Sequence, residues 1–141
     1  MRAEHQLGAA TLVSRTSLTS PTTDTVKAAL YLVSATTGPS NAAYTATGEV
    51  SGSGYSAGGV TVTNATAPSL DTTTGIWTPS ASIVFTSVTL ATAFDCVMLY
   101  NATQSNKAIA TYTFGSQTIT SGTLSLTMPA NTAAAALLRI A

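Results

Sequence analysis

The chain has 141 residues, enough for one domain that buries a core without a metal or a disulfide framework. Charged residues make up only 7% of it and the formal net charge is zero, which argues against binding to nucleic acid or to an anionic membrane. A hydrophobic fraction of 45% argues against disorder. Nearly a third of the residues are Thr or Ser, which suit strands with an uncharged polar face. Composition alone fits a surface that packs against many protein copies and a stable β-domain with a neutral exterior equally well.

The sequence of residues 1–23 indicates an N-terminal arm. Four of its side chains are charged or titratable, namely Arg2, Glu4, His5 and Arg15. The polar stretch 16–23 is interrupted by Pro21, and such a segment cannot easily bury itself alone. We expect it to be disordered in an isolated monomer and ordered against a partner. No apolar run typical of a secretory signal occurs in it.

Residues 24–141 predict a body of short strands separated by turn residues. The expected strands are 25–33, 43–49, 60–64, 75–78, 82–90, 96–101, 108–114, 123–128 and 134–140. Residues 51–59 contain four glycines and predict a loop or a bulged edge, and residues 102–107 predict a hairpin turn. The Ala- and Leu-rich stretch 133–138 could form a helix, but it is short, and a final core strand is favoured.

Eight or nine short strands at this spacing predict an all-β fold, an antiparallel β-sandwich of jelly-roll type that carries the arm as an extended segment. The alternation of apolar and polar residues predicts eight mainly buried side chains, namely Leu30, Leu32, Val62, Trp77, Phe85, Leu99, Leu126 and Leu138.

The sequence contains only weak matches to catalytic and cofactor-binding motifs. Residues 54–58 match a nucleophile elbow around Ser56, but a strand pattern follows where that motif needs a helix, and the sole histidine, His5, lies upstream. The overlapping residues 52–57 match a loose dinucleotide fingerprint and fail for the same reason. Cys96 lies in an apolar run, which predicts a buried, inert thiol. We therefore predict no catalytic residue, no metal site and no cofactor.

Aromatic residues give the clearest candidate contact surface. Tyr44 and Tyr55 flank the glycine-rich segment, whereas Trp77 and Tyr100 are expected in the core. Tyrosines beside glycines are good contact residues at protein interfaces. The candidate partner interface consists of Arg2, Glu4, His5 and Arg15 in the arm, and of Tyr44, Glu49 and Tyr55 in the body.

A family resemblance begins near residue 26. It is carried mainly by residues 43–59, AYTATGEVSGSGYSAGG, and further by residues 98–101, 107–110, 114–115, 127–129 and 138–141. In these segments the chain resembles small virion proteins of tailed bacteriophages, in particular the jelly-roll cement proteins that decorate podophage capsids. The arm falls outside the resemblance, so its role in anchoring is a separate inference.

The resemblance implies a non-enzymatic structural protein on the outer surface of the virion capsid, assembled in the host cytoplasm. Its partners would be the major capsid protein and further copies of itself, as a dimer or trimer, with no nucleic acid and no membrane. Two alternatives stay open. A tail or fibre module that binds a host receptor would show an exposed aromatic cluster on flexible loops. A small hydrolase would show a convergent pair of titratable side chains in a pocket.

Overall fold

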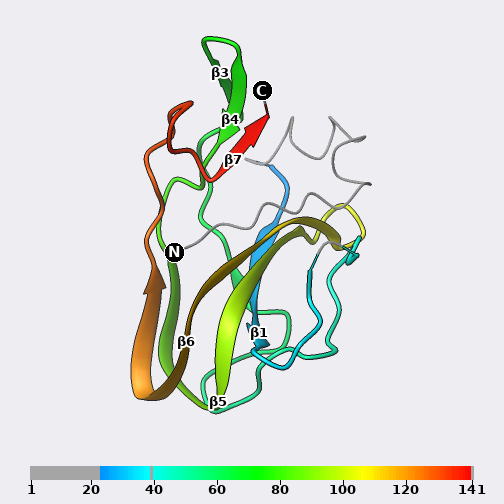
Figure 1. The fold of residues 1–141 in the computed structure, drawn as a ribbon, viewed down its shortest axis with the longest axis vertical. Coiled ribbons are helices and arrows are strands. Elements are labelled where there is room, and N and C mark those ends of the chain that lie inside the picture. The colour runs from blue at the N-terminus through cyan, green and yellow to red at the C-terminus, as the bar shows by residue number, and fades with distance from the viewer. Residues whose placement is uncertain (1–22, 39, 141) are drawn as a thin grey trace.

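The computed structural model describes residues 23–38 and 40–140, so the predicted arm lies outside the described part except for Thr23. Within these ranges the chain forms no helix, and its seven strands make two antiparallel sheets (Figure 1). The large sheet has the order β2-β1-β5-β6, with β1 (Val26–Leu32), β2 (Val60–Thr61), β5 (Ile83–Asn101) and β6 (Lys107–Leu126). The small sheet has the order β3-β4-β7, with β3 (Ser69–Asp71), β4 (Thr74–Trp77) and β7 (Leu138–Ile140). The prediction of an all-β, antiparallel fold is confirmed.

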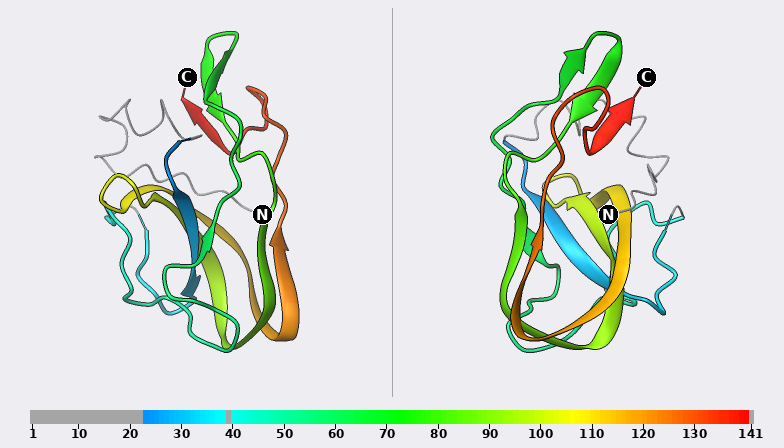
Figure 2. Two further views of the ribbon diagram at one scale, coloured as in Figure 1. Left: turned by 180° about the vertical axis from the view of Figure 1, so that it is seen from behind. Right: turned by 60° about the vertical axis from the view of Figure 1, so that its left-hand side comes forward.

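Two long strands, β5 and β6, form one hairpin of 19 and 20 residues. The expectation of four separate short strands in this region is wrong, because pairing continues through the residues expected to be turns. The register shifts at five places along the ladder, and Ser87 and Ser121 have positive φ near two of these shifts. Bulges let a ladder bend without ending. The hairpin therefore curves until its two halves face each other (Figure 2).

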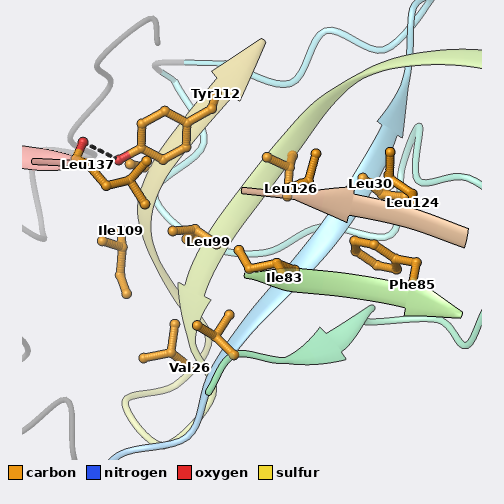
Figure 3. Packing of buried hydrophobic residues seen from close by; sticks show 14 of the residues in the cluster. Val26, Leu30, Ile83, Phe85, Leu99, Ile109, Tyr112, Leu124, Leu126 and Leu137 are labelled. Atoms are coloured by element: carbon orange, nitrogen blue, oxygen red, sulfur yellow. Dashed lines mark hydrogen bonds between the residues drawn. The ribbon is translucent and has the colours of Figure 1, made fainter. Parts of the chain in front are cut away.

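The main core fills the space between these halves. Ile83 and Phe85 from the start of β5, with Leu124 and Leu126 from the end of β6, gather with Leu30 and Leu99 in one buried cluster (Figure 3). Tyr112 closes one side of the cluster, where its hydroxyl donates a hydrogen bond to the Leu137 carbonyl over 2.8 Å. Of the eight side chains predicted to be mainly buried, seven are buried and Leu32 is partly buried.

The large sheet is buried on both faces. Alternate residues of β1 divide between two clusters: Val26, Ala28 and Leu30 join the main core, while Ala29 and Tyr31 join a second cluster on the opposite face. The second cluster also contains Cys96, Met98, Tyr100 and Ala108. Two-sided burial explains why residues 96–100 are almost continuously apolar. The Cys96 thiol is buried, as predicted.

Three elements differ between the prediction and the structure. Residues 43–49 form no strand and only bridge other strands singly, at Ala43 and Glu49, because this segment crosses over the large sheet as a cover. The predicted strand 134–140 is reduced to β7, because residues 132–136 make a turn closed by bonds from the Ala135 and Ala136 amides to the Thr132 carbonyl. Strand β3 was not predicted. Its Asp71 is followed by Thr72, which has positive φ in the tight turn to β4.

Candidate interaction site

The segment 43–59, which we call the cover, contains three of the predicted interface residues. Its residues 43–49 cross the second face of the large sheet, and the rest runs along the outer edge of β1, where Val50 and Tyr55 pack against the main core. The Tyr44 ring stacks on the Tyr100 ring of β5, with 4.8 Å between centroids. From below, the Tyr31 hydroxyl of β1 donates a hydrogen bond to the Thr45 carbonyl over 2.6 Å. Aromatic side chains of the sheet and of the cover thus hold the two layers together.

Glu49 is the centre of a hydrogen-bonded group that we call the Glu49 cluster, made of Glu49, Tyr44, Tyr55 and Gly58. The Tyr44 hydroxyl donates to Oε2 over 2.7 Å, and the Tyr55 hydroxyl donates to Oε1 over 2.7 Å. The Gly58 amide donates to the same Oε1 over 2.8 Å. Bonds to an ionised carboxylate are stronger than neutral ones, so a single glutamate fixes three points of the cover.

The cluster is anchored to the sheet beneath it at two further points. The Tyr55 hydroxyl accepts a hydrogen bond from the Leu30 amide over 3.0 Å, so it links the Glu49 carboxylate to β1. The Tyr100 hydroxyl donates to the Gly58 carbonyl over 2.7 Å. The Tyr55 ring also stacks on Phe85, which belongs to the main core. The cover is therefore built as part of the folded body.

Two glycines allow the cover to lie this close to the strands. At Gly59, where φ is +71°, a Cβ atom would overlap the Ala28 carbonyl oxygen of β1. At Gly52, a Cβ atom would overlap the Thr89 carbonyl oxygen of β5. The glycine-rich segment 51–59 is thus in backbone-to-backbone contact with β1 and β5, and its glycines serve close approach.

The tyrosines around Glu49 keep their protons well above neutral pH. Burial, together with the hydrogen bond to the nearby Glu49 carboxylate and its negative charge, raises the pKa of Tyr44 to about 12. Burial also raises the pKa of Tyr31, Tyr55 and Tyr100, and the negative charge of Glu49 adds to each shift. All four hydroxyls therefore act as hydrogen-bond donors under physiological conditions.

The Glu49 cluster is suited to holding structure. Both oxygens of the Glu49 carboxylate already accept hydrogen bonds from within the protein. Ser56 is exposed in a turn, where its carbonyl accepts a bond from the Gly59 amide, and strand β2 follows it. In the part of the chain that the structure describes, no group of His, Cys, Asp and Glu side chains could hold a metal ion. The same part contains no helix long and apolar enough to cross a membrane.

The structure brings together the three predicted interface residues of the body, Tyr44, Glu49 and Tyr55, all half-buried. The four in the arm, namely Arg2, Glu4, His5 and Arg15, lie outside the described residues. Sequence reasoning did not connect Gly58 or Tyr100 with Glu49. It also gave no reason to single out Leu70, because β3 was not predicted, or Ile140, which was expected in a core strand. Both are among the four exposed large hydrophobic side chains of the described residues.

Comparison with known proteins finds no match to a protein family, to a curated protein or to a solved structure. The resemblance to phage cement proteins therefore stays a prediction from the sequence.

Proposed function

We propose that this protein is a non-enzymatic cement protein with a jelly-roll type of β-sandwich, which binds the outside of a phage capsid and joins neighbouring major capsid proteins. The observation that carries the proposal is the exterior of the body, which offers partners almost no charge. Seven charged residues lie in the described ranges, and four of them, Asp24, Glu49, Asp71 and Arg139, make hydrogen bonds within the protein.

Such an exterior supports close packing of many copies. What the body presents to water is mainly Thr and Ser, as along the exposed middle of β6, residues 115–121. Like charges therefore do little to keep neighbouring copies apart. The rigid cover over the large sheet lets each copy present the same surface to each capsid subunit.

The mechanism is the repetition of weak contacts with the symmetry of the shell. A copy that bridges two capsid subunits makes its second contact intramolecularly, so its overall affinity exceeds that of either contact alone. The predicted arm would extend this reach, since about 23 extended residues span at most roughly 75 Å. Its Thr- and Ser-rich stretch 16–23 could pair with a sheet edge of the capsid protein, except at Pro21, which lacks a donor.

The alternative, a tail or fibre module that binds a host receptor, has less support. The feature that would favour it is an exposed aromatic cluster on flexible loops. The exposed large hydrophobic side chains of the described ranges are Val33, Leu70, Val84 and Ile140, and none is aromatic. The tyrosines nearest the surface, Tyr44 and Tyr55, are held by Glu49.

Copy number per virion tests the proposal against this alternative. Quantitative mass spectrometry of purified virions, with the major capsid protein as internal reference, should find the protein in hundreds of copies. A handful of copies per virion would indicate a tail location and overturn the cement proposal.

The contribution of the arm is tested separately. We expect a variant lacking residues 1–20 to keep the folded body and to sediment with undecorated capsids much more weakly than the full chain. Equal binding by the two proteins would show that the body alone makes the contact. Segment 44–59 would then be the expected contact surface.

A further inference from the structure

The small sheet has one face made wholly of apolar residues and glycine. Leu70 of β3 pairs with Gly75 of β4, and Gly75 pairs with Ile140 of β7, so these three residues form one row across the sheet. Trp77 pairs with Leu138 in the next row on the same face. Trp77 and Leu138 belong to the main core, whereas Leu70 and Ile140 are 71% and 42% exposed. The apolar face therefore begins inside the core and continues out into solvent.

This face carries a projection and a hollow side by side. Leu70 is the most exposed large hydrophobic side chain in the described part of the chain. Beside it, Gly75 has no side chain, and the neighbouring strands lie roughly 5 Å to either side. A cavity of about 70 Å³ opens here, lined by Pro68, Gly75, Ile76, Trp77, Leu138 and Ile140. The hollow is about the size of one small apolar group, and Leu70 is not part of its lining.

Among the described residues, no charged side chain lies on this face. The two charged residues of the small sheet, Asp71 and Arg139, are neighbours in sequence of Leu70 and Ile140, so they point to the opposite face. Both are bound within the protein. Asp71 accepts a hydrogen bond from the Ala133 amide over 2.6 Å, and Arg139 donates to the Ala134 carbonyl over 2.9 Å.

We propose that the apolar face of the small sheet is a self-association surface, and that its occupant is a second copy of this chain. Leu70 of each copy enters the hollow at Gly75 of the other. A projection and a matching hollow on one patch are what a two-fold symmetric contact requires, since each copy offers both halves of the same fit.

The contact should be weak in free solution. A stable dimer buries roughly 800 Å² on each partner, and three strands of three or four residues offer less. We expect association only at concentrations of roughly 100 μM or above. On a surface that holds many copies at fixed spacing, the effective concentration is higher and the same contact becomes significant.

Sedimentation equilibrium of the full chain over a concentration series, up to roughly 1 mM, tests the proposal. We expect concentration-dependent dimers for the natural sequence and at least roughly tenfold weaker association for Leu70→Asp. Gly75→Val should weaken it similarly, since it fills the hollow. A Cβ at Gly75 would make only ordinary contacts with Ile140, and no positive φ opposes the change. Val84→Asp is the matched control, because Val84 is 42% exposed, like Ile140, but lies on β5. It should dimerise like the natural sequence.

Circular dichroism of each variant shows whether it folds, and Leu70 and Val84 are exposed enough that both substitutions should leave the strand spectrum unchanged. A natural sequence that stays monomeric throughout the series overturns the proposal. Dimers that survive Leu70→Asp, or that are lost equally in Val84→Asp, also overturn it. The measurement needs no capsid, so its failure is distinguishable from a failure of the cement proposal.

Discussion

The apolar faces of the two sheets are buried to different extents. The large sheet is covered on one face by the other half of its own curved hairpin and on the other by residues 43–49. The small sheet has an apolar face that only its inner row, Trp77 and Leu138, buries in the core, and its outer row reaches solvent. The first arrangement stabilises one folded body. The second leaves an apolar surface, at Leu70 and Ile140, that no other part of the described chain buries.

Two glycines provide the sharpest test of this contrast. Gly59→Ala should lower the free energy of unfolding by about 3 kcal/mol or more, because the new Cβ overlaps the Ala28 carbonyl at positive φ. Gly75→Ala should change it by no more than about 0.5 kcal/mol, because the new Cβ would make only ordinary contacts with Ile140. Urea unfolding of both variants gives the comparison. Similar losses would mean that the cover is looser, or the hollow tighter, than described.

Leu99 of the large sheet and Leu70 of the small sheet show the same contrast in side-chain burial. Leu99 is fully buried, so Leu99→Ala should cost about 2–5 kcal/mol of stability. Leu70 is mostly exposed, and Leu70→Ala should change stability by no more than about 0.5 kcal/mol in dilute solution. Thermal unfolding at low protein concentration, where any self-association is negligible, measures both. A large loss for Leu70→Ala would show that this side chain supports the fold of its own chain.

Substitution of Glu49 and of Asp71 compares how firmly a carboxylate anchors the cover and the small sheet. Glu49 accepts three hydrogen bonds, whereas Asp71 in the small sheet has one described bond, from the Ala133 amide. Glu49→Gln should cost about 1–3 kcal/mol, because the new amide group must face a donor of the cover. Asp71→Asn should cost about 1 kcal/mol or less. Chemical denaturation at neutral pH would contradict the assignment if Asp71→Asn proved the more damaging change.

Alkaline pH should also lower the stability of the folded protein, by less than the substitutions above. The pKa of Tyr44 is raised to about 12 in the folded protein, above the value near 10 of an unfolded chain. The folded state therefore binds this proton more tightly, and its stabilising effect is complete below about pH 10 and lost as the pH rises toward 12. Tyr44→Phe keeps the ring but not the donor, so its stability should fall less steeply over this interval. Urea midpoints at stepped pH would show this, and parallel curves for the two proteins would contradict it.

The prediction from sequence succeeded where the pattern is local. Alternation and turn residues located β1, most of the core and the hairpin turn after Asn101, whose side-chain oxygen accepts bonds from the Thr103 and Gln104 amides. It failed where long-range contacts decide. Nothing local to residues 91–95 or 115–122 shows that bulges replace turns there, because the pairing partner lies far along the chain. Likewise, Tyr44, Glu49 and Tyr55 were selected as contact residues without any signal that they bind one another.

The most direct test of the proposed function is the binding of the full chain to undecorated capsids, followed by heating of the decorated shells. We expect saturable binding at a fixed ratio to the major capsid protein. We also expect decorated shells to break open at a higher temperature than bare ones. Absence of saturable binding, or saturation without any gain in the thermal resistance of the shell, would contradict the proposed function.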